Sequence, residues 1–291
     1  MKVSAECMHC LVRRQAEGIK KEKDEEKKAA YLAKVLEIIG TGAEEKPAPV
    51  LLSEIGRLHE DCFGTPFSFE ELKKGYNQMM MDREDEILKH IQGAEEPLKL
   101  ALKYSQIGNY IDFGALDSVD DAKLSEFLSR AESLPLDEKT YADLKRELER
   151  AETMVLLTDN CGEVVLDKLL LKTIAALYPH VRRVAVVRGE PVLNDATMRD
   201  AIQTGLIEWA ETYGNGTNVA GTYLPMVQRE AKQEILGADF ILAKGQGNFE
   251  SLHGCGLNIY YLFLCKCDWF MECFGMERFS GVFVREKDLK D

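Results

Sequence analysis

The segment 153–163, Thr-Met-Val-Leu-Leu-Thr-Asp-Asn-Cys-Gly-Glu, decides the fold class. It opens with a short apolar run typical of strands that are buried on both faces of a parallel sheet. A helical pattern over 164–177 follows, and then a second apolar run at 183–187. A strand, a helix and another strand in this order predict a parallel sheet with helices on its faces.

The same alternation continues to about residue 243. We expect a helix at 196–204, a third strand at 206–210, a helix at 224–236 and a strand at 240–243. Residues 1–150 instead repeat apolar positions at helical spacing, and a capping box at 68–71 with Phe67 and Leu72 as a staple predicts a helix from there to about residue 90. We therefore predict an all-helical domain over 1–150 and an α/β domain over 151–291.

Composition excludes several classes of protein. The 291 residues include 37 basic and 50 acidic side chains, a net charge of −13, and no Lys/Arg cluster of the kind that follows a phosphate backbone, so nucleic acid is not an expected partner. The longest apolar run, 259–265, is too short to cross a bilayer, and the first residues do not resemble a signal peptide. Eight cysteines without a secretory signal favour reduced thiols and a cytoplasmic location.

Polar side chains follow three of the expected strands. Asp159 and Asn160 follow the first, Asp195 lies in the loop after the second, and Lys244 and Gly245 follow the fourth. Each has an ordinary explanation as a helix cap or turn residue. Ligands of α/β proteins, however, bind beyond the carboxyl ends of the strands, where all three groups meet.

These groups suit metal-assisted phosphoryl chemistry. The oxygens of Asp159, Asn160 and Asp195 are ligands for Mg²⁺ or Mn²⁺, or for Co²⁺ or Ni²⁺. Lys244 and glycine-rich backbone supply positive groups for phosphate. Two routes are open: attack by water, or attack by Asp159 through an aspartyl-phosphate. We favour water, because position 161, where a haloacid dehalogenase would carry a second aspartate, is a cysteine.

Three sequence blocks together resemble the metal-dependent damage-control phosphatases, formerly domain-of-unknown-function family 89. They are Asp159-Asn160-x-Gly162-Glu163 with Asp167, Asn194-Asp195-Ala196-Thr197, and Lys244-Gly245-Gln246-Gly247-Asn248. The segment 108–114 and the Cys-x-x-Cys at 7–10 resemble the cysteine-containing subfamily. The resemblance implies a helical domain packed on a Rossmann-like α/β domain, and metabolite repair by hydrolysis of sugar phosphates or damaged cofactor fragments.

The resemblance also implies roles for individual residues. Asp159, Asn160 and Asp195 would hold the metal, and Asp159, Asp195 and Lys244 would form the catalytic set. The expected substrate and phosphate contacts are Asn109, Asp112, Glu163, Lys244, Gly245 and Asn248. Asp167 would support the site or lie on the surface.

The cysteines leave a second possibility open. Cys7, Cys10, Cys265 and Cys267 could together hold a structural zinc or iron ion, although buried free thiols are more common. Cys265 and Cys267 are expected on one strand. A non-catalytic thiolate-metal binding protein is therefore one rival to the phosphatase. The other rival is a methyltransferase using S-adenosylmethionine, a function that the family resemblance also allows. Composition and motifs leave the oligomeric state unspecified.

Overall fold

The computed structural model describes residues 1–64, 68–112 and 119–289, and its second half contains one six-stranded sheet. The strand order is β3-β2-β1-β4-β5-β6, with β6 antiparallel to β5 and the other pairs parallel. The strands are β1 (Thr153–Leu157), β2 (Arg182–Val187), β3 (Glu211–Gly214), β4 (Phe240–Lys244), β5 (Ile259–Leu264) and β6 (Gly281–Arg285). The predicted α/β part with a mainly parallel sheet is confirmed.

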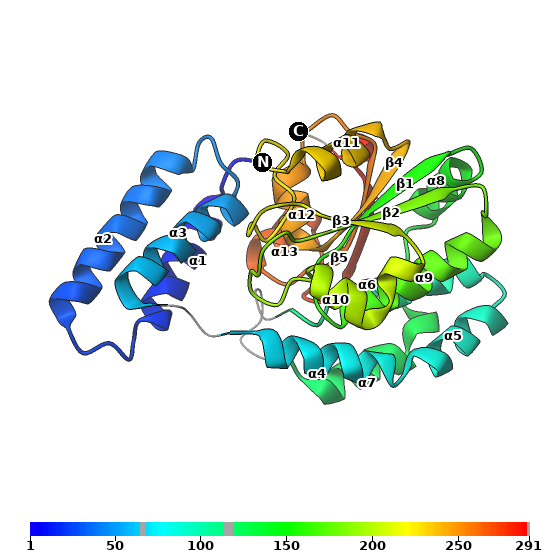
Figure 1. The fold of residues 1–291 in the computed structure, drawn as a ribbon, viewed down its shortest axis with the longest axis horizontal. Coiled ribbons are helices and arrows are strands. Elements are labelled where there is room, and N and C mark those ends of the chain that lie inside the picture. The colour runs from blue at the N-terminus through cyan, green and yellow to red at the C-terminus, as the bar shows by residue number, and fades with distance from the viewer. Residues whose placement is uncertain (65–67, 113–118, 290–291) are drawn as a thin grey trace.

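Helices cover both faces of this sheet (Figure 1). Along β1, Met154 and Leu156 face the core shared with α6 and α9, whereas Val155 and Leu157 face the core shared with α11 and α12. This alternation explains why the whole strand is apolar. The helices of the second half are α9 (Glu163–Leu177), α10 (Met198–Thr204), α11 (Arg229–Gly237), α12 (Gly245–Leu252) and α13 (Asp268–Phe274).

The described elements before residue 150 are all helical, as predicted. They are α1 (Ala5–Gly18), α2 (Glu25–Gly42), α3 (Ala48–Phe63), α4 (Glu70–Met81), α5 (Glu84–Gly93), α6 (Pro97–Gly108), α7 (Asp121–Ser129) and α8 (Glu138–Leu148). Helices α5–α8 share the core of α9 and the sheet, whereas α1–α3 have a small core of their own.

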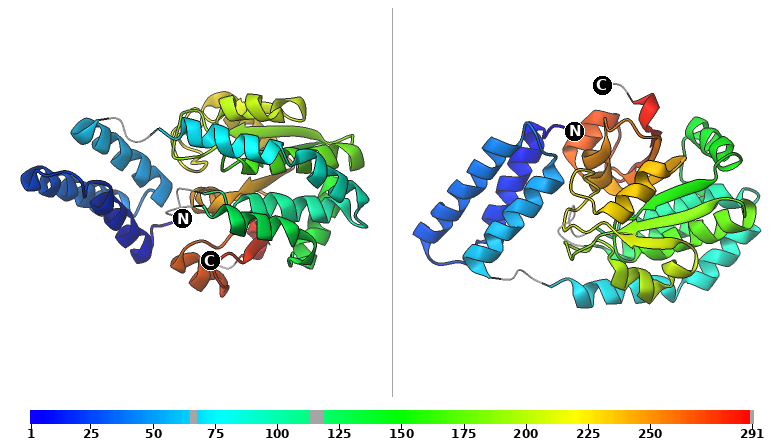
Figure 2. Two further views of the ribbon diagram at one scale, coloured as in Figure 1. Left: turned by 90° about the horizontal axis from the view of Figure 1, so that it is seen from below. Right: turned by 45° about the horizontal axis from the view of Figure 1, so that its top comes forward.

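Helices α1–α3 form a unit that stands to one side of the body (Figure 2). Helix α3 contacts α12, and α1 contacts α13. The Ser53 hydroxyl of α3 also donates a hydrogen bond to Asn218 Oδ1 at 2.6 Å. Since α12 directly follows β4 and α13 begins shortly after β5, this unit, hereafter the cap, lies beside the carboxyl ends of β4 and β5.

Several expected boundaries are wrong. Residues 206–210 are a short 3-10 helix and a turn, and the third strand begins only at Glu211, because Gly205 ends α10 in a left-handed conformation and Leu206 fills the core. The helix expected up to residue 90 is two helices that break after Met81. Helix α11 begins at Arg229 rather than 224, and the staple residue Phe67 lies outside the described residues.

Strand β5 ends at Leu264, so Cys265 and Cys267 do not lie on a strand. Sequence patterns also missed α3, α12, α13 and β6. Across the described ranges, no helix is both long and apolar enough to span a membrane.

Candidate active site

The loops after β1 and β2 are joined by backbone hydrogen bonds. Asn160 and Asp195 form an isolated antiparallel bridge, and the amide of Ala196 donates to the carbonyl of Asp159 at 2.7 Å. The amide of Cys161 donates to the carbonyl of Asn194 at 2.8 Å. These bonds bring together Asp159, Asn160 and Asp195, the three residues that the sequence suggested as oxygen ligands.

Each of these side chains is buried and oriented by its neighbours. Asp159 Oδ2 accepts hydrogen bonds from Asn160 Nδ2 at 2.7 Å and from Asn109 Nδ2 at 3.0 Å. Asp195 Oδ2 accepts from Arg188 Nε at 2.6 Å. Because the Asn160 amide nitrogen is turned toward Asp159, its carbonyl oxygen points away from that carboxylate.

Gly245 provides the space for the Asp159 carboxylate. Its φ of +77° lies in the region that favours glycine. A Cβ atom at this position would come within 1.9 Å of Asp159 Oδ2. The glycine that follows β4 therefore serves the site through close approach of its backbone to the carboxylate.

A second layer of charges lies behind these residues. Lys244 Nζ donates to Glu163 Oε1 at 2.7 Å, to Asp167 Oδ1 at 2.9 Å and to the carbonyl of Ser105 at 2.9 Å. The three side chains Lys244, Glu163 and Asp167 have no exposed surface. Asp167 is thus part of the interior, which removes the surface alternative. The ammonium of Lys244 thus makes its hydrogen bonds to oxygens of the protein. Its expected contact with phosphate stays a prediction.

Glu163 and Asn109 connect the two layers. Glu163 Oε2 accepts hydrogen bonds from the amide and the side chain of Asn160, at 3.2 and 2.9 Å. Asn109 Nδ2 lies between Asp159 and Glu163, while its Oδ1 accepts from the amide of Leu264 at 3.1 Å. Asn109, the C-cap of α6, therefore ties the ends of β1 and β5 together.

Burial controls the electrostatics of this cluster. It raises the pKa of Asp195 to about 6, although Arg188 opposes the shift. It also raises the pKa of Asp167 to about 6 against the effect of Lys244. The pKa of Asp159 is raised well above its ordinary value by burial, with further contributions from Asp195 and Glu163. A cation would favour the ionised form of these carboxyl groups.

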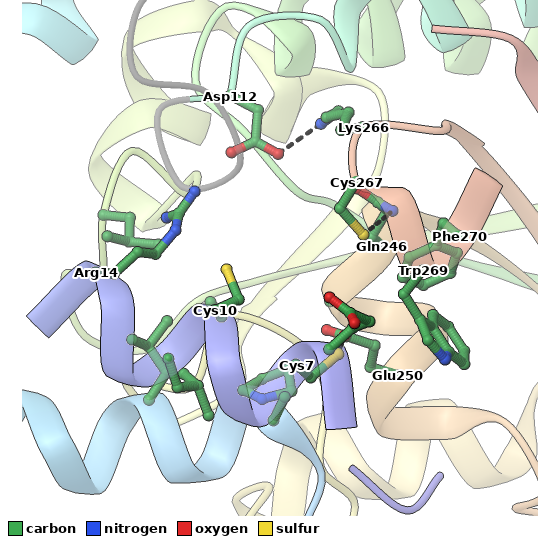
Figure 3. A pocket seen from close by; sticks show the side chains of 18 of the residues that line it. Cys7, Cys10, Arg14, Asp112, Gln246, Glu250, Lys266, Cys267, Trp269 and Phe270 are labelled. Carbon is green, nitrogen blue, oxygen red and sulfur yellow. Dashed lines mark hydrogen bonds and ion pairs between the residues drawn. The ribbon is translucent and has the colours of Figure 1, made fainter. Parts of the chain in front are cut away.

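Asp159, Asn160 and Asp195 line a cavity of 440 Å³. Figure 3 shows this cavity from close by. One wall comes from α1 of the cap, including Cys7, Cys10 and Arg14. The opposite wall comes from the starts of α12 and α13 and from the residues after β5, among them Gln246, Gly247, Lys266, Trp269 and Phe270. Its size is in the usual range for small-molecule sites.

Lys266 is a cation of this cavity that the motifs did not single out. Its side chain is fully buried, and Nζ donates to Asp112 Oδ2 at 2.5 Å (Figure 3). It comes two residues after the end of β5. A search for polar residues directly after each strand would have found it if the end of β5 had been predicted at Leu264. Arg188, directly after β2, is the second functional candidate missed.

The remaining predicted residues divide into two groups. Asp112 lines the cavity. Asn248 is instead buried in the first turn of α12, where its side chain donates to the carbonyls of Lys244 and Thr158 and accepts from the hydroxyl of Thr222. Its expected phosphate contact also stays a prediction.

Three of the four cysteines considered as metal ligands line the cavity, and the fourth, Cys265, does not. Cys7, Cys10 and Cys267 line the cavity, and the thiol of Cys7 lies 3.8 Å from Glu250 Oε1. Cys265 is fully buried, with its thiol directed at the carbonyl of Phe270. Among the described residues, no three His, Cys, Asp or Glu side chains are arranged as a metal-binding group. The thiolate metal site stays a prediction.

The sequence as a whole matches one known domain over most of its length. The damage-control phosphatase ARMT1-like domain matches residues 3–281. The chain belongs to this family. A damage-control phosphatase of Pyrococcus horikoshii is 31% identical over 276 residues, covering 92% of each chain. A damage-control phosphatase of Archaeoglobus fulgidus is 29% identical over 275 residues, covering 92% of this chain and 93% of the relative.

A solved structure supports the same membership of the damage-control phosphatase family. The crystal structure of a DUF89 family protein from Pyrococcus horikoshii superposes with a TM-score of 0.80 at 27% identity, covering 98% of this chain and 99% of that one. The resemblance drawn from the three sequence blocks is thus confirmed at the level of the family. The match leaves the subfamily and the substrate open.

Proposed function

We propose that this chain is a divalent-metal-dependent phosphatase that hydrolyses small phosphorylated metabolites. The substrate class includes sugar phosphates and phosphorylated cofactor fragments. The ion would be held by Asp159, Asn160 and Asp195. Phosphate would be held in the cavity between these residues and Lys266. The family membership supports the reaction class, and the charge balance of the site supports the ion.

The charge balance carries the proposal. Among the described residues, the ion pairs at and directly behind the site join five carboxyl groups to three basic groups. The acidic groups are Asp159, Asp195, Glu163, Asp167 and Asp112, and the basic groups are Arg188, Lys244 and Lys266. With all eight groups ionised, these ion pairs carry a net charge of −2 in a largely buried environment, which is costly. One divalent cation would neutralise this charge.

The donor atoms also fit such an ion. Carboxylate and amide oxygens are the ligands that Mg²⁺ and Mn²⁺ prefer. The hydrogen bonds described above engage Oδ2 of Asp195 and Nδ2 of Asn160, which leaves an oxygen of each side chain for the cavity. Bound there, a divalent ion supplies electrostatic stabilisation of the charge on the phosphoryl oxygens.

The chain supplies its own groups for the phosphate. Lys266, buried at the cavity wall, would donate to a phosphoryl oxygen. Gln246 and Gly247, in the first turn of α12, line the same cavity, and the start of a helix favours an anion. Lys244 would act indirectly, by holding Glu163 and through it the orientation of Asn160.

Water is the nucleophile that we propose. Hydrolysis then needs a group that takes the proton of the water, and Asp112 lines the cavity beside Lys266. Position 161, two residues after Asp159, holds a buried cysteine that offers no second acid for an aspartyl-phosphate mechanism. With a phosphate made chiral by oxygen isotopes, direct attack by water predicts inversion at phosphorus. Retention would indicate an aspartyl-phosphate.

Phosphate release tests the proposal. Protein freed of metal by chelation is assayed on p-nitrophenyl phosphate and a panel of sugar phosphates, with Mg²⁺, Mn²⁺, Co²⁺ or Ni²⁺ restored. Release is expected only after an ion is restored, and Asp159→Ala and Asp195→Ala should abolish it. Cys265→Ala is the matched control, since this buried residue lies outside the cavity. Release by the chelated protein, or full activity of either aspartate variant, would refute the metal site.

A further inference from the structure

Arg188 lies between the two acidic residues of the candidate metal site. Its Nε donates to Asp195 Oδ2 at 2.6 Å, and its Nη2 lies 3.3 Å from Asp159 Oδ1. The guanidinium has no exposed surface. Its position is fixed by the backbone, because the amide of Arg188 donates to the carbonyl of Ala196 at 2.9 Å. The arginine and Asp195 therefore begin and end one closed loop.

The burial of this guanidinium is costly. A buried arginine is ordinarily satisfied at all its nitrogens, yet Nη1 has no hydrogen-bond partner within the described residues. The backbone beside Arg188 is also tightly packed, since a Cβ on the following Gly189 would lie 2.2 Å from the backbone nitrogen of Gly216. Apolar residues in place of a whole buried ion pair are often as stable as the pair itself, so stability alone does not account for a buried arginine here.

Arg188 occupies one oxygen of Asp195 and faces the other acidic residue through a second nitrogen. A planar guanidinium can bridge two carboxylates in a fixed geometry, whereas the single ammonium of a lysine cannot. The bridge determines which oxygen of Asp195 is turned toward the cavity. It also keeps the two carboxylates at a set separation when no ion is present.

From this geometry we infer that Arg188 is the positioning residue of the metal site. It holds Asp159 and Asp195 in the orientation in which their carboxylates would bind the divalent ion. It does so from behind, since it is not part of the cavity wall. The inference rests on the proposed function, because it requires an ion at these residues.

The test measures metal binding rather than activity. Chelated protein is titrated with Mn²⁺, and free Mn²⁺ is followed by its solution electron paramagnetic resonance signal. Loss of an outer partner of a metal ligand typically costs about 10- to 100-fold in affinity, and Arg188→Met should lose this much. Arg188→Lys should recover part of it, because the charge is kept and the bridge is lost.

Lys168→Met is the matched control. This lysine is also buried, and it pairs with Glu84 at 2.5 Å and with the carbonyl of Thr204, away from the cavity. Its loss should lower stability and leave Mn²⁺ affinity unchanged. If Arg188→Met does not fold, the Mn²⁺ affinity of Arg188→Lys provides the test. An affinity below that of the unaltered chain supports the inference.

The outcomes separate the inference from the proposed function. A folded Arg188→Met or Arg188→Lys protein that binds Mn²⁺ as tightly as the unaltered chain would overturn the inference alone. An equal loss of affinity in Lys168→Met would overturn it too, since the effect would then be one of stability. An unaltered chain that binds no Mn²⁺ would refute the proposed function, and the inference with it.

Discussion

Gly245→Ala tests the link between a backbone position and the chemistry of Asp159. A Cβ atom here would lie 1.9 Å from Oδ2 and 2.2 Å from the carboxylate carbon of Asp159. Real Cβ atoms do not approach other atoms closer than 3.0 Å, so the carboxylate must retreat by roughly 1 Å. A shift of this size at a reacting group costs about 100-fold in rate.

The backbone adds a smaller and separate cost. Alanine at a φ of +77° is disfavoured by about 1–2 kcal/mol. Gly254→Ala is a control that carries the same backbone cost without the clash, because Gly254 has a φ of +82° and no heavy atom near its Cβ position within 4 Å. Both variants should lose similar stability in urea unfolding.

Activity then separates the two glycine variants. Metal-dependent phosphatase activity, measured as kcat/KM on p-nitrophenyl phosphate, should fall about 100-fold in Gly245→Ala and stay near that of the unaltered protein in Gly254→Ala. Equal activity in the two folded variants would refute the claim that the missing side chain of Gly245 leaves the space that the Asp159 carboxylate needs.

Three further predictions concern the charges of the site. The pKa of Asp195 and of Asp167 is raised to about 6, so the folded protein holds these protons more tightly than the unfolded chain does. In the presence of chelator, the free energy of unfolding should therefore fall as pH rises from 5 to 8, and Mn²⁺ should restore it at pH 8. A flat pH profile in urea unfolding would contradict this. Lys244→Met should lower the free energy of unfolding by about 3–5 kcal/mol, since two buried carboxylates lose their cation, and a loss below about 1 kcal/mol would argue against the pairing. Lys266→Met should weaken competitive inhibition by inorganic phosphate by about tenfold, a value typical of one charged hydrogen bond, and an unchanged inhibition constant would remove Lys266 from the phosphate site.

The sequence predicted the sheet and the first-strand motif well, for a physical reason. A strand buried on both faces must be apolar at every position, so β1 stands out among the amphipathic helices around it. The polar residues that follow it are then placed at the carboxyl edge by topology alone. Asp159, Asn160 and Asp195 could therefore be brought together without knowledge of any side-chain contact.

The direction of individual side chains could not be predicted in this way. Lys244 is the last residue of β4, and its side chain passes to the α6 and α9 side, where Glu163 and Asp167 bind it. Lys266 and Lys244 both follow the pattern of a basic residue at a strand end, and only the packing of α9 tells them apart. The contribution of α1 to the cavity wall could not be predicted either, because it depends on long-range contacts between the cap and the rest of the protein.

A crystal grown with Mn²⁺ and inorganic phosphate would show whether Asp159, Asn160 and Asp195 hold a divalent ion beside a bound phosphate. The anomalous scattering of manganese locates the ion without reference to activity. We expect one strong peak within bonding distance of oxygens from Asp159, Asn160 and Asp195, with phosphate between that peak and Lys266. A manganese peak at any other residues, or phosphate bound away from Lys266, would contradict this expectation.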